Sequence, residues 1–86
     1  MRTRKQPTGE KNLVGQRVEQ RRKELFMKQK DLLAKLQILG VDMNASGLSK
    51  LEGQIRFVTD SELVALARIL NVSVDWLLGL TDEENK

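Results

Sequence analysis

The side chains that could do chemistry in this 86-residue chain are its cations, because histidine and cysteine are both absent. Without them the chain lacks the commonest general base, the thiolate nucleophile and the usual transition-metal ligands. We therefore expect a protein that is not an enzyme and that uses neither a metal nor another cofactor. Its fifteen Lys and Arg side chains are suited instead to binding an anion.

The cations are concentrated near one end of the chain. Residues 1–30 carry ten Lys or Arg against three Glu, a balance of +7, whereas residues 31–86 carry five basic and nine acidic side chains, a balance of −4. Such a charge run can be a solvated face with a loose tail, or it can be the footprint of a nucleic-acid-binding surface.

The segment NASGLSKLEG, residues 44–53, is predicted to form one short helix in which Leu48 and Leu51 face inward. At 100° per residue its other side carries mostly small side chains: Ala45, Ser46, Ser49, Lys50 and Gly53. A face without bulk lets a helix lie deep in a DNA groove, where an Ala can touch a thymine methyl group. The alternative is that these small residues merely face solvent.

Helical spacing and capping residues predict four more helices around this one. The five predicted helices span residues 13–25, 28–39, 44–53, 60–70 and 74–79. Their predicted N-terminal caps are Asn12, Asn44, Thr59 with Glu62, and Ser73. Gly40 is predicted to end the second helix in a left-handed conformation, which glycine adopts at little cost, and Asn71 and Gly79 are predicted to end the fourth and fifth helices.

Eighty-six residues allow one small core and no second domain. We interpret residues 1–11 as a flexible basic arm, 12–79 as the domain and 80–86 as a frayed polar tail. Trp76 is predicted to anchor the core, and the loop after the third helix is predicted to return Ile55, Phe57 and Val58 to it. Glu52 is predicted to pair with Arg21 on the apolar stripe of the first helix, while Arg17, Arg22 and Lys23 face outward.

Three segments together resemble the helix-turn-helix domain of phage Cro and repressor proteins, the XRE family: QKDLLAKL, NASGLSKLEGQIR and LVALARILNVSVDWLLG. The resemblance covers residues 13–79. It implies an all-α, five-helix, lambda-repressor-like domain in which the second helix crosses the DNA backbone and the third lies in the major groove. It also implies a bacterial or phage-encoded cytoplasmic regulator that binds a palindromic operator in double-stranded DNA as a homodimer.

The positions that this resemblance and the charges assign to DNA are Arg17, Lys28, Gln29, Lys30, Asn44, Ala45, Ser46, Ser49, Lys50, Gly53 and Gln54. Among them, Gly53 and Gln54 fall where family members offer backbone amides to a phosphate. The arm residues Arg2, Arg4 and Lys5 could enter a minor groove or belong to a disordered solubilising tail. Expected dimer contacts are Val74, Leu78 and Leu80.

The sequence departs from the family pattern around the second helix. About five more residues than usual separate Gln29 from Glu52, which implies an extended helix or a longer turn. Lys28 stands where a capping Ser or Thr is usual. Leu33 replaces a small residue, and Gly47 is interpreted as making room for it.

The leading functional interpretation is a sequence-specific transcriptional repressor. The alternative is a protein-interaction module, an inhibitor or adaptor built on the same fold, and a third possibility is DNA packaging without sequence preference. No apolar run reaches the 18 residues that suggest a transmembrane helix, and no hydrophobic segment follows the basic N-terminus as in a signal peptide.

Overall fold

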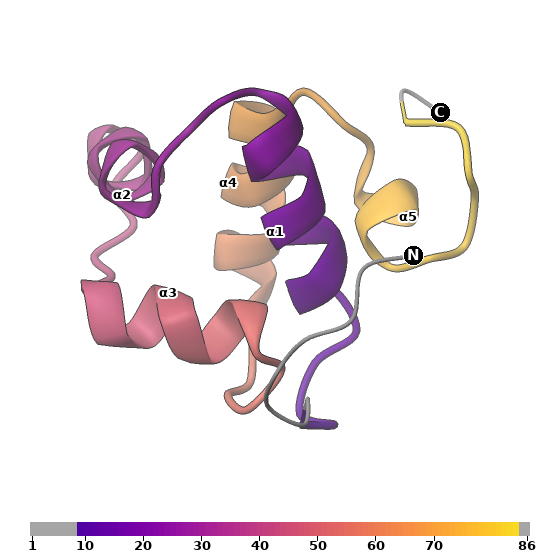
Figure 1. The fold of residues 1–86 in the computed structure, drawn as a ribbon, viewed down its shortest axis with the longest axis horizontal. Helices are drawn as coiled ribbons and strands as arrows, with labels where there is room; N and C mark the ends of the chain where they lie inside the picture. Colours follow the sequence, from indigo (N-terminus) through magenta and orange to yellow (C-terminus); the bar gives the residue numbers. More distant parts are fainter. Residues whose placement is uncertain (1–8, 85–86) are drawn as a thin grey trace.

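The computed structural model describes residues 9–84, and all regular structure within that range is helical. The five helices are α1 (Gly15–Glu24), α2 (Gln29–Ile38), α3 (Ala45–Glu52), α4 (Asp60–Leu70) and α5 (Val74–Leu77). In Figure 1, α3 lies across the bottom of the domain, below α1, α2 and α4, and the short α5 lies on the right. The predicted all-helical class with five helices is therefore confirmed.

Polar side chains begin the helices where the sequence predicts them. Asn44 accepts a backbone N–H of α3 at 2.7 Å, and Ser73 accepts one of α5 at 3.0 Å. Thr59 and Glu62 cap α4 reciprocally, since each side chain accepts the backbone N–H of the other residue, at 3.2 and 3.0 Å. These bonds satisfy N–H groups that the first helical turn leaves without an acceptor.

The predicted helix ends are also confirmed, because Gly40, Asn71 and Gly79 all have positive φ angles, of 84°, 57° and 80°. At the start of α1 the boundary differs from the prediction by two residues. Asn12 still acts as the initiating residue, because its Oδ1 accepts the N–H of Gly15 at 2.8 Å.

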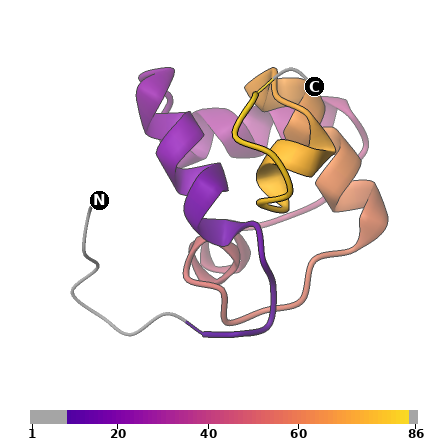
Figure 2. The ribbon, with the colours of Figure 1, turned by 90° about the vertical axis from the view of Figure 1, so that its right-hand side faces the viewer.

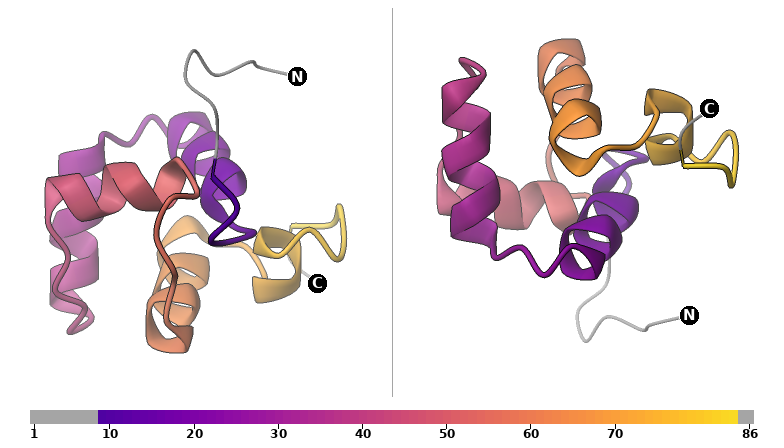
Figure 3. Two further views of the ribbon diagram at one scale, coloured as in Figure 1. Left: turned by 90° about the horizontal axis from the view of Figure 1, so that it is seen from below. Right: turned by 90° about the horizontal axis from the view of Figure 1, so that it is seen from above.

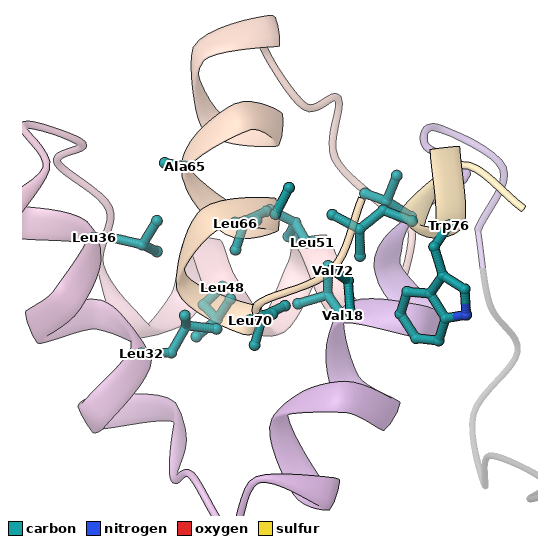
Figure 4. Packing of buried hydrophobic residues seen from close by; sticks show 13 residues of the cluster. Val18, Leu32, Leu36, Leu48, Leu51, Ala65, Leu66, Leu70, Val72 and Trp76 are labelled. Carbon is teal, nitrogen blue, oxygen red and sulfur yellow. The ribbon is translucent and has the colours of Figure 1, made fainter. Parts of the chain in front are cut away.

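One apolar core joins all five helices (Figure 4). Its fully buried side chains are Val18, Leu32, Leu36, Leu48, Leu51, Leu66, Leu70 and Leu77. Trp76 is 4% exposed at one edge of this cluster, which confirms its predicted place in the core. On α2 the buried stripe consists of Leu32 and Leu36, and Leu39, after the end of the helix, is 41% exposed.

A buried ion pair joins α1 to α3. Arg22 donates from Nε to one Glu52 carboxylate oxygen at 2.7 Å and from Nη2 to the other at 3.0 Å. The prediction that Arg21 pairs with Glu52 is wrong, and so is the outward placement of Arg22. The reason is the register of α1, whose buried stripe runs through Gly15, Val18 and Arg22. Arg21 instead donates from Nε to the carbonyl of Leu70 at 2.9 Å.

The segment before α1 runs alongside the loop after α3 (Figure 2). The backbone N–H groups of Gly9 and Lys11 donate to the carbonyls of Gly53 and Gln54, each at 2.9 Å. A Cβ at Gly9 would collide with the Gln54 carbonyl, so the close approach requires glycine. The last residues of the predicted arm are thus bonded to the domain, and residues 1–8 lie outside the described part of the chain.

The loop after α3 does not return all its apolar residues to the core. Val58 is half-buried against it, but Ile55 and Phe57 are 50% and 72% exposed, contrary to the prediction. The hydrogen bonds to residues 9–12 hold this loop at the surface, and Lys11 Nζ lies 5.4 Å from the centre of the Phe57 ring.

Among the described residues, no helix combines the length and the apolar character that a membrane crossing needs.

Candidate nucleic-acid interface

The outer face of α3 carries short side chains and one long one. Ala45, Ser46, Ser49 and Lys50 are exposed, while Leu48, Leu51 and Glu52 are buried on the opposite side. Seen from below, α3 lies in front of α1 and α2, so this face belongs to the outer surface of the domain (Figure 3). The predicted bare face is therefore present and accessible.

Gly53 is an exception, because it is buried rather than part of that exposed face. Its N–H donates to the carbonyl of Ser49 and the N–H of Gln54 to that of Leu51, both at 3.0 Å. Both amides thus already bond within the last turn of α3, and this position does not support the expectation that they are available to a phosphate. The Gln54 side chain is also engaged, because its Nε2 donates to the Asn12 carbonyl at 3.0 Å.

Gly47 serves the cap of α3 rather than the packing of Leu33. A Cβ at position 47 would lie 3.1 Å from Asn44 Oδ1 and 3.3 Å from Met43 Cγ, and Leu33 is not among its near neighbours. Leu33 is half-buried against the core without that help. The missing side chain leaves space for the Asn44 carboxamide, which is exposed at the start of the helix.

A hydrogen-bonded chain extends from the buried ion pair to the α3 surface. Glu52 Oε1 accepts from Gln29 Nε2 at 3.0 Å, and Gln29 Oε1 accepts from Ser49 Oγ at 3.3 Å. This chain fixes the first residue of α2 against α3. One N–H of the Gln29 amide and the oxygen lone pairs of Ser49 remain for an external partner. Gln29 is consequently held in place before any ligand arrives.

Three lysines are sequence neighbours of this pair: Lys28 and Lys30 flank Gln29, and Lys50 follows Ser49. All three are exposed, and none forms an ion pair with any residue in the described range 9–84. Lys28 occupies the cap position of α2, where the predicted loss of a capping side chain is offset by Asp31, whose carboxylate accepts the Lys28 backbone N–H at 2.9 Å. The three ammonium groups are therefore free to meet anions.

Arg17 does not join this group. Its Nη1 donates to the carbonyls of Trp76 and Thr81, both at 2.8 Å, and its Nη2 bonds to Asp82 at 3.0 Å. The guanidinium also stacks over the Trp76 ring at 4.7 Å. The expected role of Arg17 as a phosphate ligand is not supported by this position, because its donors are committed to α5 and the segment after it.

The polar segment after α5 is bonded to α1 rather than frayed as predicted. Arg21 Nη1 lies 3.2 Å from Glu84 Oε2, and the Ser73 N–H donates to the Glu84 backbone carbonyl. Of the expected dimer residues, Val74 and Leu78 are half-buried against the core of their own chain, and only Leu80 is well exposed, at 72%. The arm residues Arg2, Arg4 and Lys5 lie outside the described part of the chain.

Sequence reasoning did not anticipate the role of Asn12 beside this surface. Its Nδ2 donates to the carbonyls of Leu51 and Arg56, at 3.1 and 2.8 Å. The residue therefore caps α1 and fixes the end of α3 at once. The sequence showed that Asn12 could cap a helix. Nothing in the residues around it indicates that it also bonds to Leu51 and Arg56.

Side-chain hydrogen bonds thus fix both ends of α3 and the start of α2. The outer face of α3 is accessible, and the three lysines form no ion pair within residues 9–84. No family model, no curated protein and no solved structure matches the chain.

Proposed function

We propose that the chain is a sequence-specific DNA-binding transcriptional regulator of the Cro and repressor type. In this proposal α2 and α3 form the helix-turn-helix, α3 enters the major groove, and the protein acts as a repressor by occupying an operator. The observation that carries the proposal is the accessible face of α3 beside unpaired lysines at the start of α2. A helix with little bulk on its outer face can lie close to the base edges, where a small apolar side chain can touch a thymine methyl group.

The parts of this surface have different proposed tasks. Lys28 and Lys30 contact phosphates and set the position of the domain on the duplex, which carries no sequence information by itself. Lys50 donates to guanine O6 or N7, and Ala45 contacts a thymine methyl group. Gln29, held by Glu52 and Ser49, offers its free N–H to a phosphate or base at the groove edge.

The connection between α2 and α3 supports a variant of the motif rather than its minimal form. Residues 39–44 form this connection without regular structure, after an α2 of ten residues. The proposed docking therefore depends on the hydrogen bonds that join Gln29 to α3 rather than on a short turn. Binding as a homodimer to two half-sites about one helical turn apart is part of the same proposal.

A test uses a substitution on the proposed contact face. Ala45→Glu places an anion where α3 would meet DNA without touching the core, and should abolish binding to fragments selected from genomic DNA while the helical circular dichroism is retained. Asn71→Asp is the control, since it adds one negative charge at the far end of α4 (Figure 1). Binding by a folded Ala45→Glu protein that equals wild type would reject α3 as the reading helix.

The competing function is a protein-interaction module on the same fold. It is favoured by large apolar side chains that stand in solvent, among them Phe26 at 94% and Ile38 at 82% exposure. Retention on heparin followed by a gel shift with mixed genomic DNA separates the two, because an inhibitor or adaptor should show neither. Equal affinity for all fragments would instead favour packaging without sequence preference.

A further inference from the structure

The exposed side of α4 carries a stripe of one acidic, one apolar and one basic residue, in that order along the helix. Asp60, Val64 and Arg68 are four residues apart and all exposed, with Val64 at 51%. Within the described residues neither charge has an ion-pair partner, and the only side-chain bond of Asp60 is accepted from Ser61 at 3.4 Å. The Cα atoms of Asp60 and Arg68 each lie about 6 Å from that of Val64 along the helix axis.

A groove of mixed polarity adjoins this stripe, and the three stripe residues form part of its lining. It has a volume of about 620 Å³ and runs between α4 and the connection after α2, where Leu39, Val41 and Ala65 add apolar side chains. Its walls are α4 on one side and residues 39–41, which follow α2, on the other. Figure 3 shows where these two segments lie in the fold. Ile38, at the end of α2 next to Leu39, is 82% exposed. The surface therefore has both a groove and an exposed apolar side chain that could fill the same groove of a second copy.

We propose that this surface binds a second copy of the chain, with the two α4 helices antiparallel about a two-fold axis that passes close to Val64. A two-fold interface has to be self-complementary. If one residue of the first copy contacts a second residue of the other copy, the reverse contact is made as well. Antiparallel pairing reverses the order of the stripe, so Asp60 of each copy meets Arg68 of the other. Parallel pairing would instead oppose like charges.

The apolar part of the interface follows the same symmetry. Val64 meets its own copy at the axis, and the exposed Ile38 of each chain covers the groove of the other. Two apolar side chains from each copy make a small contact compared with the roughly 800 Å² per partner of a standard stable interface. The dimer is therefore weak and depends on protein concentration, and its charge pairs mainly fix its orientation.

This self-association does not rest on DNA binding, and its test needs no DNA. The chain contains no cysteine, so one introduced cysteine reports on one position. Val64→Cys should form a disulfide-linked dimer under mild oxidation, because a disulfide needs the two Cα atoms within about 7 Å. Leu80→Cys tests the flank of α5 as the rival dimer surface, and Leu13→Cys, 71% exposed, measures random collision.

Charge exchange provides the second arm of the test. Asp60→Arg and Arg68→Asp should each weaken self-association in sedimentation experiments by about tenfold or more, because each creates two like-charge contacts. The double variant should recover to within about threefold of wild type. Asp75→Arg, on α5, is the control for the added charge. Each variant is used at a temperature where its helical circular dichroism equals that of wild type.

A Val64→Cys dimer together with charge-exchange recovery would support the proposal. It would be overturned by faster cross-linking of Leu80→Cys than of Val64→Cys, or by a double variant as weak as the single ones. A wild-type protein that stays monomeric up to its solubility limit would overturn it too, and the surface would then be left to a different protein. None of these outcomes bears on the Ala45→Glu test of DNA binding.

Discussion

Arg22 and Glu52 form a two-pronged ion pair between α1 and α3, with side chains only 9% and 2% exposed. The same carboxylate accepts from Gln29 at the start of α2. One buried anion thus joins three helices and holds the residue next to the proposed reading face. Because both charges are removed from water, removing one partner lowers the free energy of unfolding much more than it would in an exposed ion pair.

We expect Arg22→Met to destabilise the domain by about 3–5 kcal/mol, because it leaves the Glu52 carboxylate buried without its cation. The double variant Arg22→Met, Glu52→Met removes both charges and should recover most of that loss. Urea unfolding at neutral pH measures the difference. Arg21→Met is the comparison, since its side chain does not touch Glu52; an equal loss in that variant would contradict a special role for the buried pair.

Replacement of Lys50 tests base reading. Lys50→Ala should weaken binding to the best operator by about 1–3 kcal/mol and relax specificity at one base pair per half-site, with a smaller effect on random DNA. Lys35→Ala removes the same charge from an exposed position on α2 and serves as control. If both variants lose affinity equally on every sequence, Lys50 contributes only charge.

Salt dependence separates the lysines from Arg17. Lys30→Ala should reduce the slope of log affinity against log salt by about two for a dimer, one counterion for each half-site. Arg17→Ala should leave the slope unchanged, because that guanidinium is bonded to Trp76, Thr81 and Asp82. Fluorescence anisotropy over a range of salt concentrations measures both. A slope that falls in Arg17→Ala would mean that Arg17 leaves those partners for a phosphate.

The stability of the domain should depend on pH through Glu62. Burial raises the pKa of this carboxyl, but the hydrogen bonds from Arg56 and Thr59 and the nearby Arg56 charge outweigh it and lower the pKa below its usual range. Because the pKa is lower in the folded state, ionised Glu62 stabilises the fold at pH values above the unfolded-state pKa of about 4.3. This stabilisation is lost as the pH falls through the folded-state pKa.

Glu62→Gln should therefore lower the free energy of unfolding at pH 7, by about 1–3 kcal/mol as expected for hydrogen bonds to a charged group, and have a smaller effect at pH 3. Urea unfolding at the two pH values measures this. The control is Asp60→Asn, an exposed carboxyl in the same helical turn. Parallel pH profiles for Glu62→Gln and wild type would assign the acid sensitivity to other groups.

The caps of the helices were predictable because they depend on neighbours within three residues. Asn44, Thr59 with Glu62, and Ser73 all cap the helices that the sequence assigns to them. The exposure of the α3 face was predictable for the same reason, since the spacing of Leu48 and Leu51 fixes which side is buried.

The errors arise where the outcome depends on distant residues. Arg21 and Arg22 are both compatible with the apolar pattern of α1, and only the contact with Glu52, thirty residues away, selects Arg22. Gly53 belongs to the α3 face by spacing, but the Gly9 segment covers it. Arg17 looks free in the sequence because Asp82 is 65 residues away.

The bonds between α1 and the end of the described chain also set an order for events on the ribosome. α1 emerges early, and its contacts with α3 can form once residue 52 has left the exit tunnel. Arg17 and Arg21, however, acquire their last partners only when Asp82 and Glu84 appear. Because domains fold as the chain is synthesised from its N-terminus, Arg17 lacks its carboxylate partner, and Arg21 has only Glu24, until residues 82–84 have left the exit tunnel. A nascent chain stalled before that point would therefore present a more cationic surface to ribosomal RNA than the folded domain does.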